Sequence, residues 1–269
     1  MVLFIMALSC LDAQAAKKVK KDRRVVAYVT SWSGVMPDPA YMTNIIYAFG
    51  HVNDTFDGVK IDNPERLRRI AQLKRENPGL EVQLAIGGWG SGGFSEMAAD
   101  PKLRKKFAED CKRIVKEYGL DGIDIDWEYP GSGAAGISSS PDDKENFTLL
   151  MKDLRKALGK KKLLTMASIA SAAFVDFPAI MKYVDFVNVM AYDLASAPNH
   201  HSPLHSSATM GRKSAESSVK AHLEAGVPAS RLVLGIPFYG RGSAPYGALT
   251  YYRSITIPEG YSEQWDSEA

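Results

Sequence analysis

The segment Asp121-Gly-Ile-Asp-Ile-Asp-Trp-Glu-Tyr-Pro130 combines the composition of a buried β-strand with four acidic residues. Side chains two positions apart on a strand share a face, so Asp124, Asp126 and Glu128 are predicted to project together, about 6 to 7 Å apart. Carboxylates gathered on a buried face need compensating hydrogen bonds, shared protons or a function. The alternate residues are predicted to point to the opposite face: Ile123, Ile125, Trp127 and Tyr129.

Three interpretations of these acids are open. The first is an amphipathic edge strand with its acids in water, although Ile123, Ile125 and Trp127 make the segment unusually apolar for that role. The second is a Mg²⁺ or Ca²⁺ site, although such sites usually draw their ligands from a bending loop or from several elements. The third is general acid catalysis, with Glu128 at the carboxyl end of the strand kept protonated by its neighbours. We favour the third.

The rest of the chain alternates strand and helix signals. Helices are predicted over 64–76, 101–118, 142–158, 177–183 and 213–225, several of them opened by Pro or Asp and closed by Gly. Near-continuous apolar strands separated by helices predict a parallel α/β sheet, and the number of units favours a TIM (β/α)8-type barrel over a doubly wound sheet. The strands are predicted over 25–32, 44–50, 81–88, 122–129, 163–170, 186–193 and 232–241.

The length and composition favour one catalytic domain over residues 24–269. A chain of 269 residues with 45% hydrophobic residues can bury one large core. The segment 242–269 shows no eighth strand or helix, so we predict a barrel truncated after its seventh strand. The net charge of +2 argues against a surface dedicated to nucleic acid or anionic membrane.

The N-terminal segment favours export. Residues 1–15 resemble a signal peptide with a small-residue cleavage site, although a positive n-region is missing, and residues 16–23 form a basic leader. The apolar stretch is too short for a transmembrane helix. We therefore expect a secreted or periplasmic protein, with lipid attachment through Cys10 as an alternative. Cys111 then has no intramolecular disulfide partner and is interpreted as a small buried hydrophobic residue.

A family resemblance rests on these residues. The pattern D-x-x-D-x-D-x-E from Asp121 to Glu128, followed by Tyr129-Pro130, resembles the catalytic signature of glycoside hydrolase family 18, and its chitinase branch in particular. The predicted strand ends at 27–32, 47–50, 85–89, 190–193 and 237–241 are also similar to segments of these chitinases. The resemblance covers roughly residues 25–241 and implies a barrel whose chemistry gathers at the carboxyl ends of its strands.

The resemblance implies a retaining hydrolase that uses its substrate's own acetamide group. Asp126 lies on the same side as Glu128 and is poorly placed as a nucleophile across the sugar. Glu128 would instead protonate the leaving oxygen and later activate water, while Asp126 would orient the 2-acetamido group. Asp124 would share a proton with Asp126, and Tyr192 would donate a hydrogen bond to the acetamide oxygen.

The remaining site residues implied by the resemblance would bind sugar. Asp193 and Arg241 would contact hydroxyl or carbonyl groups, and aromatic side chains would stack on sugar rings. No cofactor or metal is needed, although a metal site at His200, His201 and His205 is an alternative to a polar loop at the substrate rim. The expected substrate-binding residues are Tyr28, Trp32, Phe49, Gly88, Trp89, Met190, Asp193, Tyr239 and Arg241.

The expected substrate is a β-1,4-linked N-acetylglucosamine oligomer or polymer. One alternative is an endo-β-N-acetylglucosaminidase acting on N-glycans, in which the Trp-Glu-Tyr-Pro and Met-Ala-Tyr-Asp segments are usually altered, whereas both are intact here. Another is a non-hydrolytic chito-oligosaccharide-binding protein. Such members of the family typically replace the acid at the position of Glu128, but a missing eighth strand favours binding over hydrolysis. The sequence does not specify an oligomeric state.

Overall fold

A computed structural model describes residues 23–196, 199–207, 211–242 and 250–251. The predicted signal peptide over 1–15 lies outside the described residues, as does the basic leader apart from Arg23. Within the described part of the chain, no helix is long and apolar enough to cross a membrane.

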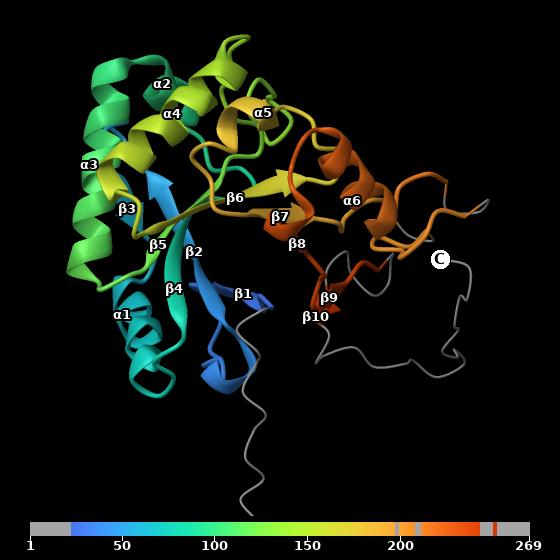
Figure 1. Ribbon diagram of the computed structural model, residues 1–269, viewed down its shortest axis with the longest axis horizontal. Helices are drawn as coiled ribbons and strands as arrows, with labels where there is room; N and C mark the ends of the chain where they lie inside the picture. The colour runs from blue at the N-terminus through green and yellow to red at the C-terminus, as the bar shows by residue number, and fades with distance from the viewer. Residues whose placement is uncertain (1–22, 197–198, 208–210, 243–249, 252–269) are drawn as a thin grey trace, which may run out of the picture.

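Eight of the strands form one curved sheet, whose parallel strands have the order β1-β2-β4-β5-β6-β7-β8 (Figure 1). All neighbours in this order pair in parallel, and β3 (Val59–Ile61) adds an antiparallel hairpin to β2. No pairing joins β8 to β1 among the described residues, so the sheet is an open part of a barrel. The parallel strands are β1 (Val26–Thr30), β2 (Asn44–Val52), β4 (Glu81–Gly87), β5 (Gly122–Asp126), β6 (Leu163–Ile169), β7 (Val187–Met190) and β8 (Leu232–Leu234). The predicted α/β fold is confirmed.

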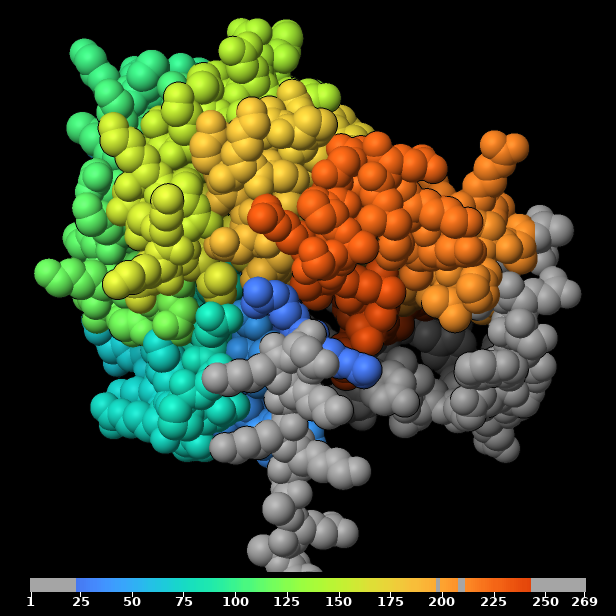
Figure 2. All heavy atoms as spheres, viewed as in Figure 1, coloured from blue at the N-terminus to red at the C-terminus, as the bar shows by residue number. Residues whose placement is uncertain are grey.

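The helices follow one another around the outside of the sheet (Figure 1), and in the space-filling view the chain runs round this side of the molecule from cyan through green and yellow to orange (Figure 2). Side-chain caps fix several of their starts: Asn63, Asp100 and Asp176 each accept a hydrogen bond from a backbone N–H of the first turn. The helices are α1 (Pro64–Gln72), α2 (Phe94–Ala99), α3 (Pro101–Glu117), α4 (Asp143–Leu158), α5 (Phe177–Ile180) and α6 (Ala215–Glu224).

Strand β5 divides its side chains between the two faces of the sheet. Ile123 and Ile125 are fully buried in the main hydrophobic core. Trp127, directly after the strand, stacks on Phe94 at 5.3 Å between ring centroids and meets Phe147 edge-on at 5.8 Å. Asp124, Asp126 and Glu128 therefore face the concave interior, as predicted.

Tyr129 departs from this alternation, and its predicted place on the core face is wrong. Strand β5 ends at Asp126, so the two-residue period of side-chain direction no longer applies at Tyr129. The Tyr129 ring instead contacts Trp89 and Phe174, and its hydroxyl group donates to Glu128.

The predicted strand over 232–241 is wrong in its second half. Strand β8 ends at Leu234, and Tyr239–Gly240 forms β9, which pairs antiparallel with β10 (Thr250–Tyr251) in a separate small sheet. The intervening Ile236 and Phe238 are 65% and 73% exposed. Strand β8 has a strand neighbour on only one side within the described residues, so no second ladder extends it. Residues 252–269 lie outside the described part.

Candidate active site

Asp124 lies at the centre of the concave face and accepts three hydrogen bonds. Tyr28 donates to its Oδ2 at 2.8 Å, and Thr165 and Asn188 donate to its Oδ1 at 2.5 and 3.2 Å. These donors come from β1, β6 and β7. Asp124 is fully buried, and this burial raises its pKa to about 6 even though the three hydrogen bonds lower it.

Gln83 on β4 orients one of these donors. Its Nε2 donates to Thr165 Oγ1 at 2.9 Å, so the hydroxyl proton of Thr165 is directed to Asp124. Gln83, Thr165 and Asn188 are not among the site residues predicted from the sequence. A usable signal was present, because each is a polar residue within an apolar strand.

Asp126 occupies the next position on the same face and is 5% exposed. Its Oδ1 is buried and has no hydrogen-bond partner among the described residues. Burial, followed by repulsion from Glu128 and from Asp124, raises the pKa of Asp126 well above its ordinary value. Asp126 is therefore a neutral acid under conditions that ionise an exposed aspartate.

Glu128 is 9% exposed at the carboxyl end of the strand. Tyr129 donates to its Oε2 at 2.9 Å. Burial raises the pKa of Glu128, the hydrogen bond from Tyr129 lowers it, and the nearby Asp193 carboxylate raises it. The net direction is upward, as a general acid near neutral pH requires.

Asp193, which directly follows the Met190-Ala191-Tyr192 segment at the end of β7, holds Arg241 and Tyr239. Arg241 donates from Nε to Oδ1 at 2.7 Å and from Nη2 to Oδ2 at 2.5 Å, and the Tyr239 hydroxyl group donates to Oδ2 at 2.8 Å. Burial raises the pKa of Asp193, but the hydrogen bonds from Arg241 and Tyr239 outweigh it and hold the pKa below its ordinary value. Three of the expected sugar-binding residues thus form one ion-paired cluster.

Tyr192 lies between this cluster and the buried acids. Its ring meets that of Tyr239 edge-on at 6.1 Å. Burial, and then repulsion from the ionised forms of Asp126 and Tyr239, raise the pKa of Tyr192, so its hydroxyl group stays protonated and available as a donor. Met190, at the end of β7, is half-buried.

Aromatic rings lie at the carboxyl ends of the early strands. Trp32 and Trp89 are 62% and 65% exposed, as rings that stack on a ligand must be. Trp32 lies 6.5 Å from Phe49 between ring centroids. Tyr28 is partly exposed, but its hydroxyl group is committed to Asp124.

Two glycines let strand ends approach closely beside these rings. A Cβ atom at Gly87 would lie 2.0 Å from the carbonyl oxygen of Asp126, and one at Gly88 would lie 3.0 Å from the Phe49 ring. Both glycines have positive φ, which disfavours any other residue. Gly88 therefore contributes a backbone conformation to the site that leaves room for the Phe49 ring.

The loop after Glu128 is tied down by Asp143, a fully buried carboxylate at the start of α4. It accepts hydrogen bonds from the Gly131 and Ser140 backbone N–H groups at 3.1 and 2.7 Å and from the Ser95 hydroxyl group at 2.8 Å. Asp143 thereby connects both ends of this loop to helix α2.

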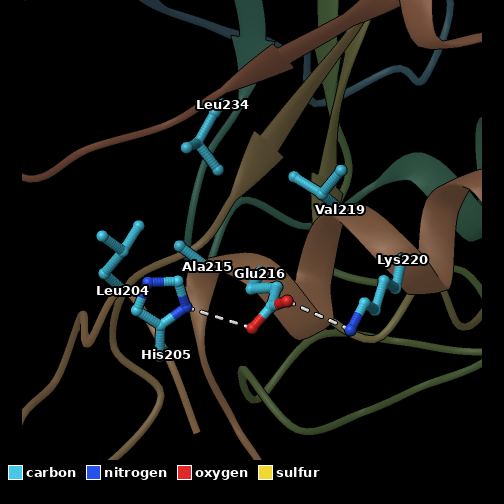
Figure 3. Close-up of a pocket in the computed structure, with 7 residues that line it drawn as sticks. All are labelled: Leu204, His205, Ala215, Glu216, Val219, Lys220 and Leu234. Atoms are coloured by element: carbon cyan, nitrogen blue, oxygen red, sulfur yellow. Dashed lines mark hydrogen bonds and ion pairs between the residues drawn. The ribbon is translucent and has the colours of Figure 1, made fainter. Parts of the chain in front are cut away.

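The three histidines after β7 do not gather into one site. His201 contacts Asp193 at 3.3 Å, whereas His205 pairs with Glu216 at 3.1 Å beside an apolar pocket of about 370 Å³ (Figure 3). No group of three His, Cys, Asp or Glu side chains within the described residues could hold a metal ion. The pocket contains none of the expected site residues. Its lining is Leu204, His205, Ala215, Glu216, Val219, Lys220 and Leu234.

Buried carboxylates with raised pKa values, flanked by exposed aromatic rings at the carboxyl edge of a parallel sheet, are features of the barrel-type glycoside hydrolases as a class. The chain belongs to family 18 of the glycosyl hydrolases, and the match to this family covers residues 24–267. The family predicted from the acidic motif is confirmed.

Individual relatives agree with this assignment. The chain is 39% identical over 214 residues to Chitinase A1 of Niallia circulans, a match that covers 70% of this chain and 31% of that protein. It is 34% identical over 251 residues to Chitotriosidase-1 of Mus musculus, covering 81% of this chain and 53% of that protein. The chain thus spans about a third to a half of the length of these curated relatives.

Solved structures show the same fold. The chitinase domain of the spore coat protein CotE from Clostridium difficile matches with a TM-score of 0.82 and 33% identity, covering 95% of this chain and 76% of that one. A family 18 N-acetylglucosaminidase from Paenibacillus barengoltzii matches with a TM-score of 0.81 and 34% identity, covering 91% and 83%.

Proposed function

We propose that this chain hydrolyses β-1,4-linked N-acetylglucosamine oligomers or polymers, with retention of configuration and with the substrate's 2-acetamido group as the nucleophile. The observation that carries the proposal is the row of Asp124, Asp126 and Glu128, buried on one face with the pKa of each carboxyl group raised. Relatives named as chitinases support this substrate class.

Glu128 begins the reaction as a general acid. It protonates the glycosidic oxygen while the acetamide oxygen of the same sugar attacks the anomeric carbon, so that the bond to the leaving sugar breaks and an oxazolinium ring forms. The Glu128 carboxylate then takes a proton from a water molecule that attacks the anomeric carbon. Ring opening restores the acetamide group and the neutral acid.

Asp126 and Tyr192 assist the acetamide group. The unpartnered Oδ1 of Asp126 is available to accept a hydrogen bond from the acetamide nitrogen, and the protonated Tyr192 hydroxyl group is available to donate to the acetamide oxygen. Asp124 accepts hydrogen bonds at both carboxylate oxygens, which favours its ionised form and leaves the shared proton with Asp126.

The neighbouring carboxylates support substrate assistance over a carboxylate nucleophile. Asp126 ends β5 and Glu128 follows it by two residues, so both carboxylates lie on the same side of the site, whereas a retaining enzyme with two carboxylates places its nucleophile across the sugar. Both oxygens of Asp193 are held by Arg241 and Tyr239, so that carboxylate is a poor nucleophile as well.

A second candidate is chito-oligosaccharide binding without hydrolysis. The exposed rings of Trp32 and Trp89 favour sugar binding whether or not cleavage follows. An intact Glu128 favours hydrolysis.

The deciding experiment incubates N-acetylglucosamine oligomers with the parent chain and with Glu128→Gln, and follows the products by mass spectrometry. Loss of the general acid should lower the rate at least about 100-fold. Glu65→Gln is the matched control, since Glu65 is an exposed glutamate on α1. A Glu128→Gln rate close to that of the parent would remove the acid from the mechanism. Binding of oligomers without cleavage by the parent would favour the second candidate.

We also propose that the protein is exported, with the apolar segment over 1–15 as its signal peptide. The support is the sequence pattern alone. N-terminal sequencing of protein recovered outside the cytoplasm tests this proposal, and an intact Met1 in exported protein would contradict cleavage.

A further inference from the structure

We infer that Phe174 is a positioning residue for the catalytic acid. Its ring stacks on the ring of Tyr129, and this contact keeps the Tyr129 hydroxyl group hydrogen-bonded to one oxygen of Glu128. The inference rests on the proposed function, in which Glu128 is the general acid, and it adds a residue from a loop far away in the sequence.

The contact between Phe174 and Tyr129 is a well-formed stack. The ring centroids lie 5.5 Å apart with an angle of 10° between the ring planes. Trp89, at the end of β4, meets Tyr129 edge-on at 6.4 Å. The Tyr129 ring is thus held between the loops that follow β4 and β6, which restricts its rotation.

The held ring directs a hydrogen bond to the acid. The Tyr129 hydroxyl group donates to Oε2 of Glu128 at 2.9 Å. In a neutral carboxyl group the carbonyl oxygen is the better acceptor, so the hydrogen bond to Oε2 favours the proton on Oε1. The ring therefore selects which oxygen protonates the substrate, and its hydroxyl group stabilises the carboxylate that remains after transfer.

The backbone that carries Phe174 shows that this ring is placed at a cost. Phe174 has φ of 68° and Ala172 has φ of 56°, both in the left-handed region that residues other than glycine seldom adopt. Such strain persists where surrounding contacts determine the conformation, and it concentrates at functional sites. Here the stack on Tyr129 is a contact that the strained loop makes beside the catalytic acid.

Other titratable groups also face Glu128. They are Asp126 at the end of β5, and Tyr192 and Asp193 after β7. Each of these three groups interacts electrostatically with Glu128. Substitutions at Phe174 and Tyr129 leave these groups in place. A change in the titration of Glu128 in such variants therefore reports on the Tyr129 hydroxyl group.

The test is a carbon-13 NMR titration of protein labelled at the glutamate carboxyl carbons, with the Glu128 signal assigned by its loss in Glu128→Gln. Removing a hydrogen bond to a carboxylate in Tyr129→Phe should raise the Glu128 pKa by about one pH unit or more. Phe174→Ala should raise it by at least half as much, and the double variant should match Tyr129→Phe alone. The alkaline limb of kcat/KM against pH should move by the same amounts.

Three further variants separate positioning from packing. Phe174→Tyr keeps the stacked ring and should leave the Glu128 pKa unchanged. Phe174→Leu keeps apolar bulk without a ring face, so it should shift the pKa even if Phe174→Ala does not fold. Tyr41→Ala removes an exposed aromatic ring outside the site and is the control.

The outcomes distinguish this inference from the proposed function. An unchanged Glu128 pKa in the Phe174 variants, together with a shift in Tyr129→Phe, would overturn the positioning role, as would additive shifts in the double variant. The titration needs no turnover. A parent chain that does not cleave oligomers but shows the expected shifts would therefore contradict the hydrolytic function and support the role of Phe174.

Discussion

The hydroxyl group of Tyr28 donates a hydrogen bond of 2.8 Å to Asp124, although the two residues are 96 positions apart in the chain. Tyr28 lies on β1 and Asp124 on β5, which are not neighbours in the sheet. The bond therefore crosses the concave interior and reports the curvature of the sheet. Burial raises the pKa of Asp124, and through this bond a side chain of β1 lowers it again in part.

Tyr28→Phe should weaken the folded state more at neutral pH than at acidic pH. The substitution removes a hydrogen bond to a buried carboxylate, which is worth about 1.5 to 3 kcal/mol. The loss should shrink near pH 4, where Asp124, with a pKa of about 6, is protonated. Urea unfolding at both pH values measures this. Tyr41→Phe is the control because Tyr41 is 67% exposed. Equal losses at both pH values would contradict the prediction.

Asp124→Asn should become more stable relative to the parent as pH rises. Burial raises the pKa of Asp124 from 3.8 to about 6, so the folded state holds this proton more tightly than the unfolded chain does. The resulting stabilisation is fully present below pH 3.8 and is lost as pH rises through about 6, a change of about 3 kcal/mol. Asparagine cannot ionise.

Urea unfolding of Asp124→Asn and of the parent from pH 4 to pH 7 measures this difference. Asp54→Asn, at an exposed position, is the matched control for the same chemical change. A difference between Asp124→Asn and the parent that does not change with pH would show that Asp124 titrates at its ordinary value.

In partially deacetylated oligomers, cleavage should occur only next to a sugar that carries an N-acetyl group. If that group is the nucleophile, every new reducing end produced by the parent will carry an N-acetylated sugar, which mass spectrometry of the products reveals. Asp126→Asn should slow this cleavage by about 100 to 1,000-fold, since it replaces a group that interacts with developing charge. New reducing ends without acetyl groups would argue against substrate assistance.

Asp143→Ala should lower both stability and activity. The substitution leaves the donors on Ser95, Gly131 and Ser140 without their buried acceptor, at a cost of about 3 kcal/mol or more. The freed loop begins directly after Glu128, so kcat should fall as well. Asp142→Ala changes the neighbouring exposed aspartate, whose side chain makes no cap hydrogen bond, and is the control. Wild-type kcat in folded Asp143→Ala would limit the loop to a structural role.

The sequence predicts those features that depend on local pattern. The alternation of Asp124 and Asp126 with Ile123 and Ile125 predicts their division between the two faces, and the structure confirms it. The breaks at Pro64 and Pro101 likewise locate two helix starts. The order of strands then follows from the preference for adjacent parallel units.

Features that depend on contacts distant in sequence could not be predicted in this way. The end of β8 at Leu234 depends on whether a strand lies on its far side, and the apolar run that continues to Phe238 gives no sign of that. The stack of Phe174 on Tyr129 joins two loops. The donors that reach Asp124 depend on sheet curvature, which no single segment encodes.

Strand β5 carries the carboxylates of Asp124 and Asp126 in strict alternation with the core side chains of Ile123 and Ile125, with every residue from Gly122 to Asp126 buried. Insertion or deletion of one residue would exchange the two faces, with carboxylates driven against the helices and isoleucines onto the concave face of the sheet. A substitution in this strand changes one side chain on one face, whereas a change in its length alters the core face and the acidic face together. We therefore expect replacement of its apolar residues by others of similar volume to be tolerated better than any change in the length of this segment.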